Sequence, residues 1–175
     1  RYDWNETFNQ WAFSYKQERE YDDNGNRTLS IFYTWDETIS QWIGNNKSKR
    51  EYDVNGNQTL HITYSWDEIT SQWIGNDKYE HAYDDNGNDT LSIHYDWDET
   101  INQWVGETKC ESDYYYSENR MLEIKYYWDL ITSKWVGRYK EEKEYNDNGC
   151  ITLWIEYNWD ETTSQWIGEH KEEWD

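Results

Sequence analysis

The chain of 175 residues contains no proline, only two cysteines and one methionine, and no long apolar run. Because proline cannot donate to a strand ladder, its absence is consistent with a chain that is mostly paired strand. No apolar segment approaches the length that crosses a bilayer, so we expect no membrane insertion. The two cysteines, Cys110 and Cys150, do not fix the redox compartment.

Positive charge is also scarce. The chain has 16 lysines and arginines against 37 aspartates and glutamates, which gives a net charge of −21. Nucleic acids and anionic lipids bind through clustered lysine and arginine, so we expect neither as a partner. The charge and the mean hydropathy of −1.33 would suit a disordered acidic chain. Regular columns of tryptophan and tyrosine argue against disorder, because disordered segments are poor in aromatic residues.

Tryptophan, in contrast, is abundant and evenly spaced. One column recurs every 31 residues and a second follows it by seven, and together they contain 12 of the 14 tryptophans. The first column is Trp4, Trp35, Trp66, Trp97, Trp128 and Trp159, and the second is Trp11, Trp42, Trp73, Trp104, Trp135 and Trp166. This unbroken period predicts one tandem array over residues 1–175, of about 5.6 repeats. Both ends fall within a repeat, so we expect a segment of a longer protein.

Each repeat reads as two strands joined by a tight turn. Leu60, Ile62, Tyr64 and Trp66 alternate with polar residues, which is the period of a strand with one apolar face. The preceding Asn-Gly is the strongest short-range hairpin signal. The turn residues predicted in this way are Asn24, Gly25, Asn55, Gly56, Asn86, Gly87, Asn148 and Gly149. In the fourth repeat Glu118 stands where glycine would be left-handed, so we expect a different loop there.

The face on which side chains lie depends on the turn type. We prefer a three-residue loop, with a left-handed Gly56 in a bulge, that pairs Asp53 with Asn57. This register places Arg50 opposite Leu60 and Ser48 opposite Ile62. It also places a glycine beside each tryptophan of the first column, Gly44 beside Trp66 for example.

A second connection of six residues pairs the two tryptophan columns, as Trp66 with Trp73. The result is an aromatic row along one face, consisting of Trp35, Trp42, Trp66, Trp73, Trp97, Trp104, Trp128, Trp135, Trp159, Trp166, Tyr33, Tyr64, Tyr95, Tyr126 and Tyr157. The opposite face is expected to carry the lysine column of Lys16, Lys47, Lys78, Lys109, Lys140 and Lys171, paired with glutamates across strands.

The expected fold is therefore all-β: tandem hairpins forming a continuous, twisted antiparallel meander or spiral sheet of eleven or twelve strands. A parallel β-solenoid with one turn per repeat is the alternative. It would stack identical acidic residues, such as Asp36 and Asp67, ~4.8 Å apart. Hairpin repeats double that separation to ~9.6 Å, which like charges tolerate better, so the meander is favoured.

No residue set indicates catalysis. Acidic pairs such as Asp36-Glu37 recur in loop after loop, whereas an active site is normally built once, so we predict that the chain is not an enzyme. Asp22, Asn24 and Asn26 offer oxygen atoms at alternating positions, as calcium loops do. They lack the downstream bidentate glutamate, and the turn chemistry explains them fully. We therefore expect no cofactor, with a calcium ion in this loop as the weaker alternative.

The turn sequences resemble those of the bacterial YD repeats, also called RHS repeats. The signature Tyr-Asp-x-Asn-Gly-Asn-x-Thr stands at residues 21–28, 52–59 and 83–90 and is weakened at residues 145–150. The resemblance covers about eight residues per repeat, and the Trp-Asp-Glu-Thr segment lies outside it. It implies spiralling hairpin sheets on large secreted or cell-surface bacterial proteins, hence an extracellular or surface location. The toxin-carrying end of some such proteins has no counterpart here.

What covers the aromatic face decides between functions. If identical repeats or chains cover or extend the sheet, the protein is a structural extracellular fibre, stalk or filament, which we expect. If the tryptophan and tyrosine rows stay exposed, they stack on sugar rings, and the protein is a polysaccharide-binding or adhesive module. A scaffold segment of an RHS-like toxin or adhesin is a third reading.

Overall fold

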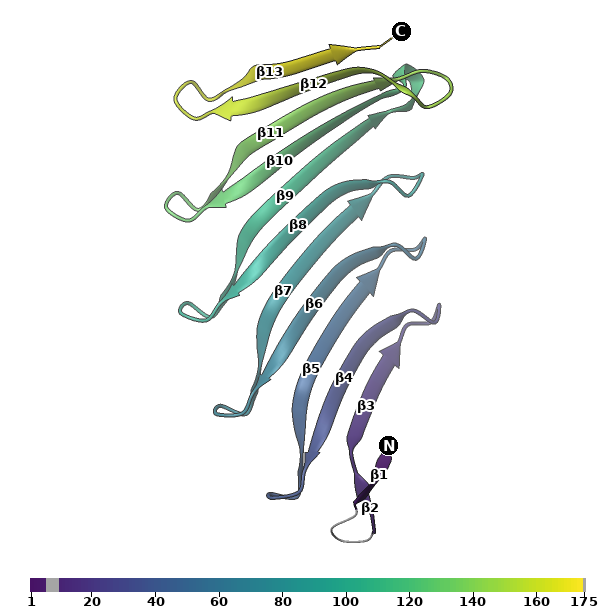
Figure 1. Cartoon of the computed structure of the whole chain (residues 1–175), viewed down its shortest axis with the longest axis vertical. Coiled ribbons are helices and arrows are strands. Elements are labelled where there is room, and N and C mark those ends of the chain that lie inside the picture. The colour runs from purple at the N-terminus through teal and green to yellow at the C-terminus, as the bar shows by residue number, and fades with distance from the viewer. Residues whose placement is uncertain (6–9, 175) are drawn as a thin grey trace. The chain divides into compact units, whose positions relative to one another are not determined.

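A computed structural model describes residues 1–5 and 10–174 of the chain, and side chains from residue 14 onward together with that of Arg1. Trp4 and Trp11 of the predicted columns lie outside the described side chains. The chain is all-β, with one short 3₁₀ helix (Figure 1). Its strands are β1 (Tyr2–Asn5), β2 (Gln10–Phe13), β3 (Tyr15–Tyr21), β4 (Arg27–Asp36), β5 (Gln41–Tyr52), β6 (Gln58–Asp67), β7 (Gln72–Tyr83), β8 (Asp89–Asp98), β9 (Gln103–Tyr115), β10 (Arg120–Asp129), β11 (Lys134–Tyr145), β12 (Ile151–Asp160) and β13 (Gln165–Glu173).

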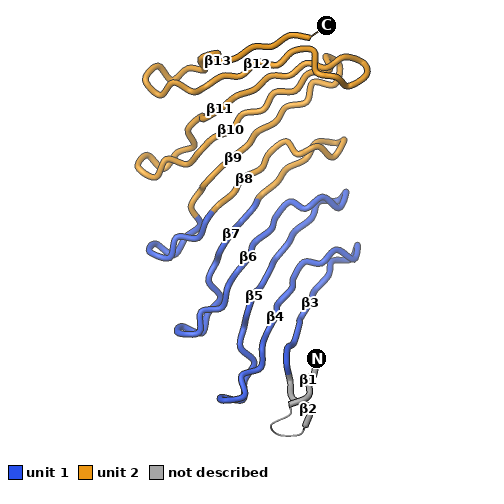
Figure 2. Tube along the Cα trace, viewed as in Figure 1, with its two compact units in different colours: residues 1–79, 96–104 blue, residues 80–95, 105–175 orange. Residues whose placement is uncertain are grey.

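Strand order confirms the antiparallel meander. Eleven strands form one sheet in the order β13 to β3, so every strand is hydrogen-bonded to its neighbours in the chain, and β1 and β2 form a separate pair. Pairings such as β4 with β5 and β10 with β11 are antiparallel. The parallel solenoid is therefore wrong, because its strands would pair with equivalents one repeat away. The array divides into a first compact unit, residues 1–79 with 96–104, and a second, residues 80–95 with 105–175 (Figure 2).

The tight turns have the predicted geometry. The Asp53 amide donates to the Asn57 carbonyl at 2.9 Å, and the Gly56 amide donates back to the Asp53 carbonyl at 3.1 Å. Gly56 has a φ of 86°, which side chains disfavour, and Gly25, Gly87 and Gly149 have values of 85°, 83° and 77°. The three-residue loop expected from Asn-Gly is confirmed at all four positions.

The strand register differs from the prediction by one residue. A bulge between Glu51 and Tyr52 puts Glu51, rather than Arg50, opposite Leu60. Lys49, rather than Ser48, is then opposite Ile62. The extra residue reverses the parity of the strand beyond the bulge, because alternate side chains point to opposite faces. The predicted pairs of Arg50 and Ser48 were therefore wrong.

The fourth hairpin has a different turn, as expected. A 3₁₀ helix, η1 (Tyr116–Glu118), replaces the tight turn, and Asn119 has the left-handed φ of 49°. Glu118 therefore avoids the left-handed conformation that glycine takes in the other turns. Asparagine tolerates this region better than glutamate, since its short side chain can hydrogen-bond locally.

Burial is slight throughout the described residues. Ile31, at 9% exposed, is the one apolar side chain that counts as buried, and Ser30 and Ser112 are the buried polar ones. The tryptophans of both columns from Trp35 to Trp166 are half-buried. Each unit thus depends on its aromatic layer rather than on a closed core. Within the described residues no helix is long or apolar enough to cross a membrane.

Candidate functional site

The two tryptophan columns meet across the six-residue loops, as predicted. Trp35 is opposite Trp42, with ring centroids 5.2 Å apart and an interplanar angle of 68°. Edge-to-face packing of this kind adds ~0.5–1.5 kcal/mol to the burial of the rings. The same T-shaped contact recurs at 5.0–5.1 Å in Trp66–Trp73, Trp97–Trp104, Trp128–Trp135 and Trp159–Trp166.

Glycines let the second tryptophan of each hairpin reach the preceding hairpin. A Cβ atom on Gly44 would lie 2.8 Å from the rings of both Trp66 and Trp73. Trp73 also meets Tyr33 edge-on, with centroids 6.4 Å apart. One indole of β7 thus contacts β4, β5 and β6. The predicted glycine beside the first-column tryptophan is confirmed for Trp66, Trp97, Trp128 and Trp159. In the second unit Trp135 and Trp166 cover Gly106 and Gly137 in the same way.

The lysine column lies on this aromatic face, which corrects the prediction. Lys16 is opposite Tyr33, and its ammonium nitrogen is 4.2 Å from the tyrosine ring centroid. Lys109 and Lys140 lie 4.0 Å from the rings of Tyr126 and Tyr157, and Lys47 lies 5.0 Å from Tyr64. The sequence signal was the constant spacing of the lysines, which matches the tyrosine column. The bulge moved them to the tyrosine side.

In several repeats the lysine and the tyrosine share a glutamate, as Lys16 and Tyr33 share Glu18, whereas Lys49 occupies that position beside Lys47. Lys109 pairs with Glu111 at 2.8 Å, and the Tyr126 hydroxyl donates to the same carboxylate at 2.7 Å. Burial favours the neutral carboxyl, but hydrogen bonds from Lys109 and Tyr126 outweigh it and lower the pKa of Glu111. Burial and the Glu80 carboxylate raise the pKa of Tyr95 to about 12. In these triads the lysine ammonium lies close to the tyrosine ring.

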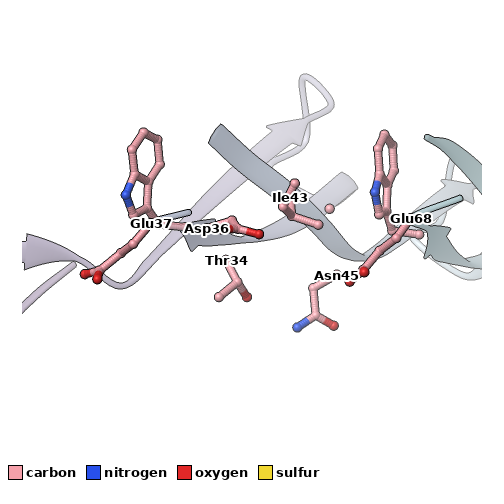
Figure 3. A pocket seen from close by; sticks show the side chains of 9 residues that line it. Thr34, Asp36, Glu37, Ile43, Asn45 and Glu68 are labelled. Carbon is pink, nitrogen blue, oxygen red and sulfur yellow. The ribbon is translucent and has the colours of Figure 1, made fainter. Parts of the chain in front are cut away.

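Shallow pockets recur beside the six-residue loops. In the pocket of about 570 Å³ drawn in Figure 3, Thr34 and Asn45 point to the same side, between Glu37 and Glu68. Because Thr34 is opposite Ile43, it lies on the face opposite the Trp35–Trp42 pair. A second pocket of about 510 Å³ in the first unit uses the equivalent Ser65, Asn76 and Glu99, and a third in the second unit uses Tyr127 and Glu161.

The aspartate of the candidate calcium loop accepts hydrogen bonds from its own turn. One carboxylate oxygen of Asp22 accepts the amides of Asn24 at 3.0 Å and Asn26 at 2.8 Å, and the other accepts the side-chain amide of Asn26 at 3.1 Å. These hydrogen bonds, that of the Asn26 side chain foremost, lower the pKa of Asp22. The oxygen atoms therefore stabilise the left-handed turn, as those of Asp53 also do.

The two thiols have different surroundings. Cys110 is half-buried, and Cys150 is exposed at a turn. Burial, aided by the nearby Glu123 carboxylate, raises the pKa of the Cys110 thiol to about 11. A thiol with this pKa is a poor nucleophile at neutral pH, because the thiolate is the reactive form.

No family model matches the chain, and no curated protein is similar to it at a significant level. Among solved structures, a protein of unknown function from Bacteroides fragilis is 14% identical, with a TM-score of 0.43 and coverage of 93% of both chains. A DUF3836 family protein from Bacteroides vulgatus is 18% identical, with a TM-score of 0.42 and coverage of 53% of this chain and 90% of that one. Another, from Parabacteroides distasonis, is 19% identical, with a TM-score of 0.35 and coverage of 50% and 81%. Similarity at this level carries no functional information.

Proposed function

We propose that the chain is a structural repeat array: a non-enzymatic, extracellular or cell-surface protein of bacterial type that builds a fibre, stalk or filament. The observation that carries this proposal is the contact of each second-column tryptophan with the hairpin before it, as Trp73 contacts Gly44 and Tyr33. Stability then comes from nearest-neighbour interfaces, so hairpins can be added without limit on length.

The charges on the aromatic face favour growth from strand to strand. A second sheet packed on this face would bury the lysine and glutamate columns, for instance Lys140 and Glu142, which are paired with each other at 2.7 Å. Removing such ions from water costs several kcal/mol per ion before any pairing is counted. Addition of a hairpin at a sheet edge removes these ions from water only in part, because Lys140 and Glu142 within the sheet keep 17% and 20% of their side chains exposed. Identical repeats, in the same or another chain, are therefore the proposed partners.

Sedimentation velocity tests this self-association. Over a wide range of protein concentration we expect species larger than a single chain, which grow with concentration because edge-to-edge addition is an open, head-to-tail contact. A single sedimenting species with the mass of one chain at every concentration would contradict the proposal.

Polysaccharide binding remains the second candidate, and the recurring loop pockets favour it. Their amide, hydroxyl and carboxylate groups, such as Asn45, Thr34 and Glu37, suit sugar hydroxyls. The aromatic row is a weaker platform, since its tryptophans pack edge-to-face and lysines cover the tyrosines. Retention on neutral polysaccharide that is lost in Asn45→Ala with Asn76→Ala would support this function. If the double variant were retained on polysaccharide as strongly as the parent, the pockets would not be the sugar-binding site.

A further inference from the structure

The fourth hairpin turn breaks the pattern of the array. Residues 115–119 read Tyr-Tyr-Ser-Glu-Asn where the other turns keep Asn-Gly. Asn119 has a φ of 49°, a conformation for which those turns use glycine. The replacement removes the Asn-Gly that favours the tight turn. The apolar strand positions of the same repeat are retained as Leu122, Ile124, Tyr126 and Trp128. Natural chains break local rules chiefly where a site requires it.

A tyrosine-rich pocket lies at this turn, within the second unit. Its volume is about 460 Å³, and four tyrosines, Tyr114, Tyr115, Tyr116 and Tyr145, line it together with Met121 and Asp147. The size and the apolar, aromatic lining with few polar groups are typical of small-molecule sites. We call these six residues the tyrosine pocket.

Contacts with the preceding hairpin hold two of the tyrosines in place. The Tyr116 hydroxyl donates to the Asp84 carboxylate, and the Tyr114 hydroxyl donates to the Asp89 carbonyl at 3.3 Å. The rings of Tyr114 and Tyr116 are stacked with centroids 6.3 Å apart. Rings fixed in advance lose little conformational entropy when a ligand binds.

The charge around the tyrosine pocket favours a cation. One basic residue, Arg120, also lines the cavity, and its charge is compensated by Glu142 at 3.2 Å and Glu118 at 3.9 Å. The Arg120 guanidinium lies 5.2 Å from the Tyr115 ring centroid, so it occupies one face of that ring. Asp147 adds a carboxylate, in a chain whose net charge is −21.

We propose that the tyrosine pocket binds an alkylated ammonium group of the kind found in choline. Tyrosine rings attract cations through their electron-rich faces, and alkylated ammonium ions are favoured ligands of such sites. A primary ammonium is strongly hydrated and costs more to strip of water. Methyl groups also give the ligand an apolar surface that matches Met121 and the rings. The site is independent of the structural role proposed above.

Calorimetric titration of the intact chain tests the ligand class. Choline is compared with ethanolamine, which carries a primary ammonium, and with 3,3-dimethyl-1-butanol, its uncharged carbon isostere. We expect choline to bind about tenfold more tightly than either, and its affinity to fall at high salt. Equal affinity for the isostere, or no measurable binding of choline, overturns the proposal.

Variants locate the site. Tyr115→Leu removes the ring and should weaken choline binding about tenfold, whereas Tyr115→Phe keeps it and should bind within about twofold of the parent. Asp147→Asn should weaken choline but leave the isostere unchanged. Tyr21→Leu is the matched control, because Tyr21 is 56% exposed and ends β3 at the first hairpin turn. Circular dichroism confirms folding of each variant. If Tyr21→Leu loses choline binding, or if Tyr115→Leu binds choline as tightly as the parent, the ligand lies elsewhere and the proposal is overturned.

Discussion

At the residue scale, glycine and tryptophan form one unit of structure. A Cβ atom on Gly137 would lie 2.9 Å from Trp166, closer than real contacts allow. Gly168 occupies the same repeat position, but its Cβ would come no nearer than 4.0 Å to any side chain. The two positions therefore separate the effect of the indole from the intrinsic cost of glycine in a strand.

Gly137→Ala should destabilise the protein by ~1–3 kcal/mol, because the indole ring must move out of its packed position. Gly168→Ala should be neutral or stabilising by a few tenths of a kcal/mol, since alanine costs less entropy than glycine. Urea denaturation followed by tryptophan fluorescence measures both. An equal decrease in the free energy of unfolding in the two variants would mean that the glycine is not needed to make room for the tryptophan ring.

The turn aspartates make the stability of the folded chain depend on pH. A hydrogen bond from Tyr116, with those from Asn88, lowers the pKa of Asp84 to about 2. Because the folded-state pKa lies below the unfolded value, the stabilisation is complete above about pH 4 and is lost as the pH falls toward about 2. NMR titration should find this low pKa, and Tyr116→Phe should raise it toward the ordinary value. An unchanged pKa in Tyr116→Phe would contradict the assigned hydrogen bond.

At the element scale, the hairpins could be predicted from the sequence, but the face of the sheet on which some side chains lie could not. Asn55-Gly56 specified the loop, and the tryptophan spacing specified the Trp66–Trp73 pairing. Lys47 was placed on the wrong face because a single bulge reverses strand parity, and no local residue type marks where the bulge falls. The Tyr115–Asn119 turn was recognised as irregular, but its pocket depends on Tyr145 from another hairpin.

We expect each lysine on the aromatic face to stabilise its hairpin modestly, and we expect salt to weaken this stabilisation little. Lys109→Gln removes the contact with Tyr126 and the pair with Glu111, and should cost ~0.5–1 kcal/mol. The Lys109 side chain is only 15% exposed, so salt should screen this loss little. Exposed Lys134 provides the control, because Lys134→Gln should change stability by less than ~0.5 kcal/mol. Denaturation at low and high salt compares them, and an equal effect of both substitutions would contradict the assignment.

At the scale of the whole molecule, stability resides in repeated contacts between neighbouring hairpins. Ile31 is the one buried apolar side chain among the described residues, so no central core limits the length of the array. Aromatic pairs, glycines that seat them, and lysines over tyrosines recur within each unit. An array built in this way can be lengthened by further hairpins, which is why a structural role is proposed ahead of a binding one.

Fibre diffraction from concentrated, aligned protein tests the central claim most directly. If hairpins add edge to edge into filaments, we predict a meridional reflection at ~4.8 Å, the strand spacing, with a hairpin repeat at ~9.6 Å. Discrete particles that give no filament and no oriented strand spacing would contradict the account.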